Sequence, residues 1–124
     1  MYKIMLADDE GIVIDSLKFI IEKEFKDTCE VQYAKTGRSV IELAESFRPD
    51  VAVMDIQMPE MDGYKATQAI RRLPDKDKAC IPIIAMTANA FEEDKKMALA
   101  SGMNDHVAKP IDMNVLLPTI MKYM

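Results

Sequence analysis

At 124 residues the chain has the length of one domain with one hydrophobic core, and we expect a single domain over residues 1–124. Its content of 49% hydrophobic and 30% charged residues is typical of a globular protein and excludes a disordered or fibrous one. The formal net charge of −5 argues against direct nucleic-acid binding by this chain, because phosphate binding depends on clustered lysine and arginine.

The sequence shows no membrane or export signal. Its longest apolar stretch, residues 79–88, contains Pro82 and is about half as long as a membrane-spanning helix. The N-terminus has neither an apolar signal core nor a small-residue cleavage site, so we expect a cytoplasmic protein. Cys29 and Cys80 form no closely spaced pair of the kind that binds zinc, and we expect both to be free thiols.

Apolar runs of strand length alternate with helical patterns along the chain. The expected strands are residues 4–7, 31–34, 51–54, 81–86 and 106–108. Helical spacing is clearest after the first two strands, in the sets Val13, Leu17, Ile20, Ile21 and Val40, Leu43, Ala44, Phe47. Parallel neighbours in a sheet need crossover connections, so this alternation predicts an α/β fold: a doubly wound, five-stranded parallel sheet with five helices on both faces.

The last expected helix follows Asp112, which is a suitable N-cap residue. Pro118 falls inside this helix, where it removes a backbone hydrogen bond and crowds the preceding turn. We therefore expect the helix to be kinked, to be short, or to begin later than Asp112.

Five polar side chains follow the ends of four expected strands. Asp8 and Asp9 follow the first strand, Asp55 the third, Thr87 the fourth and Lys109 the fifth. Functional groups of an open parallel sheet collect at the carboxyl ends of its strands. Each residue alone has an ordinary explanation as a helix cap, a turn residue or a solvated charge. Ordinary caps and turn residues would not all fall at the carboxyl ends of the strands. The sequence therefore predicts a functional site at that edge of the sheet.

The three acids of this set indicate a metal site. Neighbouring carboxylates repel one another, and one would become protonated unless a cation held them together. Oxygen ligands suit Mg²⁺, which takes one or two carboxylates together with a phosphate oxygen, and Mn²⁺ could take its place. Beside the ion, the Thr87 hydroxyl and the Lys109 ammonium would offer a hydrogen-bond donor and a positive charge to a phosphoryl group.

At these residues the sequence resembles a response-regulator receiver domain of two-component signal transduction, over residues 3–121. The matching motifs are LADDE, MDIQMPEMDG, IIAMTA and the pair Lys109–Pro110. The resemblance implies a flavodoxin-like sheet with strand order 2-1-3-4-5. MLADDEGIVIDSL is similar to receivers that precede DNA-binding outputs, whereas IPIIAMTANAFEEDKKMALASGMNDHVAKPI is similar to receivers of hybrid histidine kinases.

The resemblance implies a phosphoacceptor and its metal ligands. Asp55 would be the nucleophile that takes a phosphoryl group from a histidine kinase or a histidine phosphotransfer protein in a phosphorelay. Asp9, Asp55 and the backbone carbonyl of Gln57 would bind Mg²⁺ directly, and Asp8 would hold the ion through water. The product would be an aspartyl phosphate, formed and hydrolysed by the chain's own Mg²⁺-dependent chemistry.

The resemblance also implies how the phosphoryl group is held. Thr87 would donate a hydrogen bond to a phosphoryl oxygen, and Lys109 would pair with the Asp55 carboxylate or the phosphate. Pro110 would follow a cis peptide bond.

Phosphorylation would also switch the conformation. The new charge would draw Thr87 inward, and the loop and helix after the fourth strand would repack. Most receivers have an aromatic residue three positions before the lysine, and its side chain moves into the space that the threonine hydroxyl vacates. In this chain that residue is His106. Its imidazole would either take this part or be an exposed polar group of an edge strand. Gln57 and Asn89 match positions that tune the lifetime of the acyl phosphate, and a phosphorylation-dependent homodimer is a further expected partner.

Two other functions compete with this one. An aspartyl-phosphate hydrolase would use similar groups, but Gln57 stands where its second aspartate would be, and 124 residues leave no room for its cap module. A binding module of the same fold that does not depend on phosphorylation would not need the complete set of polar residues. A nucleotide-binding protein is excluded, because no glycine-rich phosphate loop follows the first strand.

Overall fold

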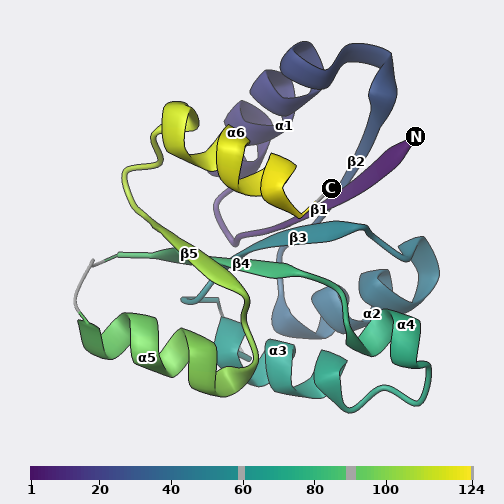
Figure 1. The fold of residues 1–124 in the computed structure, drawn as a ribbon, viewed down its shortest axis with the longest axis vertical. Coiled ribbons are helices and arrows are strands. Elements are labelled where there is room, and N and C mark those ends of the chain that lie inside the picture. Colours follow the sequence, from purple (N-terminus) through teal and green to yellow (C-terminus); the bar gives the residue numbers. More distant parts are fainter. Residues whose placement is uncertain (59–60, 89–91, 124) are drawn as a thin grey trace.

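The computed structural model describes residues 1–58, 61–88 and 92–123. Its centre is one parallel sheet with the strand order β2-β1-β3-β4-β5 (Figure 1). The strands are β1 (Tyr2–Ala7), β2 (Cys29–Ala34), β3 (Val51–Asp55), β4 (Ile83–Thr87) and β5 (Asp105–Ala108). This is the flavodoxin-like strand order that the resemblance implied, and it confirms the expected doubly wound, five-stranded parallel sheet.

Helices cover both faces of the sheet. Figure 1 shows α1 (Gly11–Phe25) and α6 (Met113–Lys122) on one face. On the other face lie α2 (Gly37–Phe47), α3 (Gly63–Arg71), α4 (Lys76–Ala79) and α5 (Glu92–Ser101). A 3₁₀ turn, η1 (Lys26–Thr28), follows α1. Among the described residues, no helix is long and apolar enough to span a membrane.

The described chain contains six α-helices, one more than the sequence predicted. The additional helix is α4, a single short turn in the connection from α3 to β4. The Asp75 side chain caps it by accepting a hydrogen bond from the Asp77 backbone N–H. Local capping therefore creates a helix that is too short for hydrophobic periodicity to reveal.

Two hydrophobic cores lie on the two sides of the sheet, because successive strand residues point to opposite faces. Ile4 and Leu6 face the core beneath α1 and α6, whereas Met5 and Ala7 face the core beneath α2, α3 and α5. All four side chains are fully buried. A strand buried on both faces reads as a continuous apolar run, which explains why the central strands were recognisable in the sequence.

Helix α6 contains Pro118 and begins directly after Asp112, not later. The Asp112 carboxylate accepts a hydrogen bond from the Asn114 backbone N–H, so the predicted N-cap is confirmed. The helix continues past the proline to Lys122. Leu116 and Ile120 are fully buried on either side of Pro118, and this packing offsets the missing backbone hydrogen bond.

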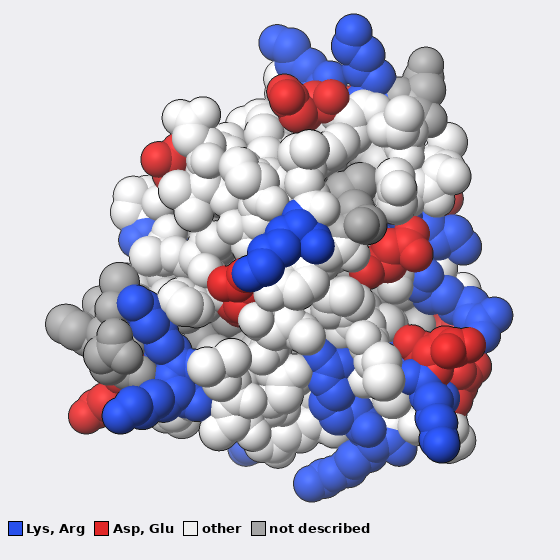
Figure 2. Space-filling view, viewed as in Figure 1, with Lys and Arg blue, Asp and Glu red and all other residues white. Residues whose placement is uncertain are grey.

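Figure 2 shows the surface in the same view as Figure 1, in which β5 runs across the near side. Charged side chains of both signs lie around the rim of this face, and one basic side chain beside an acidic one crosses its middle. Of the two cysteines, Cys29 is buried and Cys80 is exposed, and both are free thiols, as the sequence predicted.

Candidate functional site

The carboxyl ends of four strands meet at one edge of the sheet and carry the predicted polar residues. Asp8 directly follows β1, Asp55 ends β3, Thr87 ends β4 and Lys109 directly follows β5. The parallel register aligns these ends through the pairs Ala7↔Met54, Asp55↔Met86 and Thr87↔Ala108. The structure therefore brings together side chains that are up to 101 residues apart in the sequence.

Three carboxylates form the acidic part of the site. Asp8, Asp9 and Asp55 each offer one oxygen, and these oxygens all lie within 4.8 Å of one another. The Asp8 and Asp55 residues are 0% and 4% exposed, while Asp9 is exposed. Burial raises the pKa of the Asp8 carboxyl above its ordinary value, and the nearby Asp55 charge adds to this effect. The cluster therefore holds negative charge at a cost that a bound cation would relieve.

Backbone groups orient the two buried carboxylates. The Glu10 N–H donates a hydrogen bond to Asp8 Oδ1 over 2.9 Å, and the Gln57 N–H donates to Asp55 Oδ1 over 3.1 Å. Both bonds span two residues, so each aspartate is held by the turn that directly follows its strand. The Oδ2 atoms are left to face the middle of the site.

Lys109 joins these two aspartates. Its Nζ lies 3.0 Å from Asp55 Oδ2 and 3.3 Å from Asp8 Oδ2. Burial works to lower the pKa of the Lys109 ammonium, but its bonds and charge interactions with Asp55 and Asp8 outweigh burial and hold that pKa above its ordinary value. The Lys109–Pro110 peptide bond is cis, as the resemblance implied. The lysine is therefore a fixed positive charge within the site.

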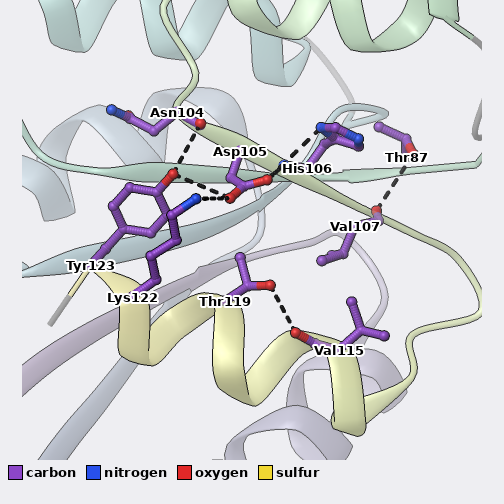
Figure 3. A network of polar contacts seen from close by, with 9 residues as sticks. All are labelled: Thr87, Asn104, Asp105, His106, Val107, Val115, Thr119, Lys122 and Tyr123. Carbon is purple, nitrogen blue, oxygen red and sulfur yellow. Dashed lines mark hydrogen bonds and ion pairs between the residues drawn. The ribbon is translucent and has the colours of Figure 1, made fainter.

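Thr87 and His106 lie on the neighbouring strands β4 and β5 (Figure 3). The buried Thr87 hydroxyl donates to the Val107 carbonyl at 3.5 Å, a long and weak hydrogen bond that it can exchange for another acceptor. The His106 side chain is 30% exposed, and its Nδ1 lies 4.0 Å from Asp105 Oδ1. Gln57 adjoins the acids, whereas the predicted lifetime residue Asn89 lies outside the described residues.

Gly63, the last residue of the MDIQMPEMDG motif, also shapes the site. A Cβ built on Gly63 would lie 2.6 Å from the Asp55 carbonyl oxygen and 2.9 Å from the Ile56 Cα. The Gly63 N–H donates to the Ile56 carbonyl over 2.7 Å. Glycine therefore lets the start of α3 pack directly against the end of β3. The signal was the glycine of the MDG motif.

Sequence reasoning missed two further residues, Tyr64 on α3 and Asp94 on α5. Together with Gln57 and Thr87 they line a small cavity of about 60 Å³ beside the site. A tyrosine and an aspartate thirty residues apart, each in an ordinary helical context, carry no sequence signal for this arrangement. Only the packing of α3 beside α5 brings them together.

The chain matches the model of the response regulator receiver domain over residues 4–121. PilH of Pseudomonas aeruginosa is 33% identical over 97% of this chain and 95% of its own length. The histidine-protein kinase BarA of Escherichia coli is 32% identical over 97% of this chain, which corresponds to only 12% of the kinase.

A solved structure with a similar fold is the receiver domain of the sensor histidine kinase PA1611 from Pseudomonas aeruginosa. Its TM-score is 0.82 at 31% identity, over 98% of this chain and 96% of that one, and a magnesium ion is coordinated in its active-site cleft. The family match covers nearly the whole sheet together with the site at its carboxyl edge. By its sequence and its strand order, the chain belongs to the response regulator receiver domain family of two-component signal transduction.

Proposed function

We propose that this receiver domain occupies residues 1–124, accepts a phosphoryl group on Asp55 in a Mg²⁺-dependent reaction, and changes conformation in response. The observation that carries the proposal is the contact of Lys109 Nζ with both Asp55 and Asp8 beside a third carboxylate. This arrangement combines a nucleophile, a cation and a set of metal ligands within one site. It supplies what phosphoryl transfer requires, namely alignment and charge neutralisation.

The donor atoms fit Mg²⁺. The carboxylate oxygens of Asp8, Asp9 and Asp55 lie close enough together to surround one ion. Asp9, Asp55 and the backbone carbonyl of Gln57 would bind it directly, and Asp8 would hold it through water. Asp9 is the exposed member of the set, which suits an ion that keeps several of its waters. When bound, Mg²⁺ would neutralise negative charge on the phosphoryl oxygens, and Mn²⁺ offers the same chemistry.

The side chains of the chain perform the transfer itself. An Asp55 carboxylate oxygen forms a bond to phosphorus while the phosphorus–nitrogen bond of a donor phosphohistidine breaks, and the imidazole nitrogen keeps the electron pair. Lys109 neutralises the carboxylate and the incoming phosphoryl oxygens. The Thr87 hydroxyl gives up its long bond to Val107 and donates to a phosphoryl oxygen. If His106 takes the part of the usual aromatic residue, its imidazole on β5 would follow the Thr87 hydroxyl.

The donor is a histidine kinase or a histidine phosphotransfer protein. This part of the proposal is supported by the similarity to BarA and to the receiver domain of PA1611, both of which are histidine kinases. A phosphorylation-dependent homodimer, a role of Gln57 and Asn89 in the acyl phosphate lifetime, a cytoplasmic location and the lack of nucleic-acid binding remain predictions.

Intact-mass analysis with Mg²⁺ and acetyl phosphate tests the proposal, with Asp55→Asn as the control. We expect the mass to rise by one phosphoryl group only with Mg²⁺ and only when Asp55 is present. A folded protein that gains no phosphoryl group would instead favour a binding module that works without phosphorylation.

A further inference from the structure

The cavity beside the site lies between the first turns of α3 and α5. Gln57 and Thr87 line it on the side of the phosphoacceptor, and Tyr64 and Asp94 line it on the side of the two helices. We call it the Tyr64–Asp94 pocket. Thr87 belongs both to this pocket and to the proposed phosphoryl site, so the pocket adjoins that site at the Thr87 side chain.

The size of the pocket selects its occupant. A cavity needs roughly 10–15 Å³ of this measure to hold one water, whereas small-molecule ligand sites are typically about 300 Å³ or larger. With about 60 Å³ the pocket accepts a few water molecules and excludes a nucleotide or a metabolite. Apolar and polar residues line it together, and the polar ones, Gln57, Tyr64, Thr87 and Asp94, can supply the two to four hydrogen-bond partners that an ordered water requires.

Tyr64 and Asp94 have complementary hydrogen-bonding capacity. Burial, followed by the charges of Asp94 and Asp62, raises the pKa of the Tyr64 phenol, so Tyr64 stays neutral and can donate its proton in a hydrogen bond. An ionised Asp94 carboxylate can only accept. Together they can bind one water through its lone pair and through its proton, which fixes the direction in which the remaining lone pair points.

We propose that Tyr64 and Asp94 are positioning residues for hydrolysis of the aspartyl phosphate, and that they orient the attacking water in the Tyr64–Asp94 pocket. This inference rests on the proposed phosphorylation of Asp55. The water oxygen forms a bond to phosphorus while the bond between phosphorus and the Asp55 oxygen breaks. Asp55 regains its carboxylate, and both protons of the water end on the released dihydrogen phosphate.

The role explains why a site that forms an acyl phosphate would carry this cavity at its margin. Phosphoryl transfer from a protein donor needs no water, but hydrolysis of the aspartyl phosphate consumes one. Orientation of a reactant is a large contribution to rate, so two groups that hold one water set how long the phosphorylated state lasts.

The test measures the loss of the phosphoryl group after the donor is removed. The protein is phosphorylated with Mg²⁺ and acetyl phosphate, separated from the donor by rapid gel filtration, and followed by intact-mass analysis. The variants are Tyr64→Phe and Asp94→Asn. Their matched controls are Tyr33→Phe, on the exposed side of β2, and Glu93→Gln, an exposed neighbour of Asp94 on α5.

We expect each pocket variant to hydrolyse its aspartyl phosphate about fivefold more slowly, the effect of losing one hydrogen bond. Both controls keep the parent rate. Asp94→Glu restores hydrolysis at least in part, because it keeps the carboxylate. Phosphorylation rate and Mg²⁺ affinity stay within about twofold of the parent, which a general distortion of the site would not allow.

Two results would overturn the inference. In one, the pocket variants lose the phosphoryl group as fast as the parent. In the other, hydrolysis, phosphorylation and Mg²⁺ affinity all fall together, which would give Tyr64 and Asp94 a purely structural role. If the parent itself gains no phosphoryl group, the proposed function fails and the inference fails with it. This outcome differs from the two results above, in which the parent is phosphorylated.

Discussion

The Lys109 ammonium lies 3.0 Å from Asp55 Oδ2, although the two residues are on separate strand ends of the sheet. The same ammonium lies 3.3 Å from Asp8 Oδ2, so one cation forms ion pairs with two buried carboxylates. The Lys109 side chain is 27% exposed, against 6% for Asp55 and 1% for Asp8. The charge of Lys109 therefore stabilises the folded state, because it offsets the negative charge of two buried carboxylates.

Replacing Lys109 by methionine removes this cation and keeps most of the side-chain volume. In protein freed of divalent metal, we expect the free energy of unfolding to fall by about 1–3 kcal/mol, less than for a fully buried pair because Lys109 is partly exposed. Urea unfolding in a chelating buffer measures the change. Lys122→Met is the control, since Lys122 pairs with Asp105 at the surface, and its effect is expected to stay below about 1 kcal/mol. An equal loss in both variants would contradict the special role of Lys109.

Asp8 destabilises the metal-free protein at neutral pH. Burial raises the pKa of Asp8 in the folded state, so folding favours its protonated form. Protonated Asp8 therefore stabilises the folded protein at pH values below its pKa in the unfolded chain. This stabilisation is lost as the pH rises through the higher pKa of Asp8 in the folded protein. Asp8→Asn removes this loss, and we expect a higher Tm than the parent at pH 7 in the absence of metal, with a smaller difference near pH 4.

Thermal unfolding across this pH range, with and without Mg²⁺, checks the prediction for Asp8. The parent should regain stability when Mg²⁺ is added, because a ligand that binds only the folded state stabilises it. Asp8→Asn should regain less. A variant whose Tm difference from the parent is the same at pH 4 and pH 7 would show that burial of the charge is not the cause.

Gly63→Ala places a methyl group against the backbone of the phosphoacceptor strand. The new Cβ would lie 2.6 Å from the Asp55 carbonyl oxygen, and a backbone neighbour cannot move aside as a flexible side chain does. We expect a loss of about 1–3 kcal/mol in stability and slower phosphorylation of Asp55. Gly11→Ala is the control, because its Cβ would meet only the flexible Lys35 Nζ at 3.5 Å. Urea unfolding and intact mass after acetyl phosphate treatment report the two effects.

Tyr123 attaches the end of α6 to β5 (Figure 3). Its hydroxyl lies within hydrogen-bond distance of two acceptors, Asp105 Oδ2 at 3.2 Å and the Asn104 carbonyl at 3.1 Å, which share its single proton. Tyr123→Phe should lower the free energy of unfolding by about 1 kcal/mol. Burial and the charge of Asp105 raise the pKa of Tyr123 in the folded protein. The stabilisation is therefore present at pH values below the pKa of this tyrosine in the unfolded chain, and it disappears as the pH rises through its pKa in the folded protein.

Alkaline unfolding curves separate the Tyr123 bond from a general effect of losing a hydroxyl. The parent should lose stability more steeply than Tyr123→Phe as the pH rises past about 10. Tyr33→Phe is the control on β2, where the ring contact with Lys18 survives the change. Parallel curves for the parent and Tyr123→Phe would contradict the prediction.

The sequence by itself determined the alternation of strands and helices and the edge at which Asp8, Asp55, Thr87 and Lys109 meet. Both follow from local information: apolar runs mark strands buried on two faces, and parallel strands bring their carboxyl ends to one edge. The cap at Asp112 is also a local signal, because its side chain accepts a hydrogen bond from the backbone N–H of Asn114, two residues further on. The helix α4 was missed, since one capped turn has no periodicity.

Only the tertiary structure decided how these residues are buried and which of them touch. It leaves Asp9 exposed but buries Asp8 completely, although the two are adjacent in the sequence. It also joins Lys109 to two acids at once and places Tyr64 beside Asp94. Burial and distance depend on how segments far apart in the chain pack together, and spacing along one sequence does not record that packing. The pKa directions of Asp8 and Lys109 depend on the same burial, so they too come from the fold.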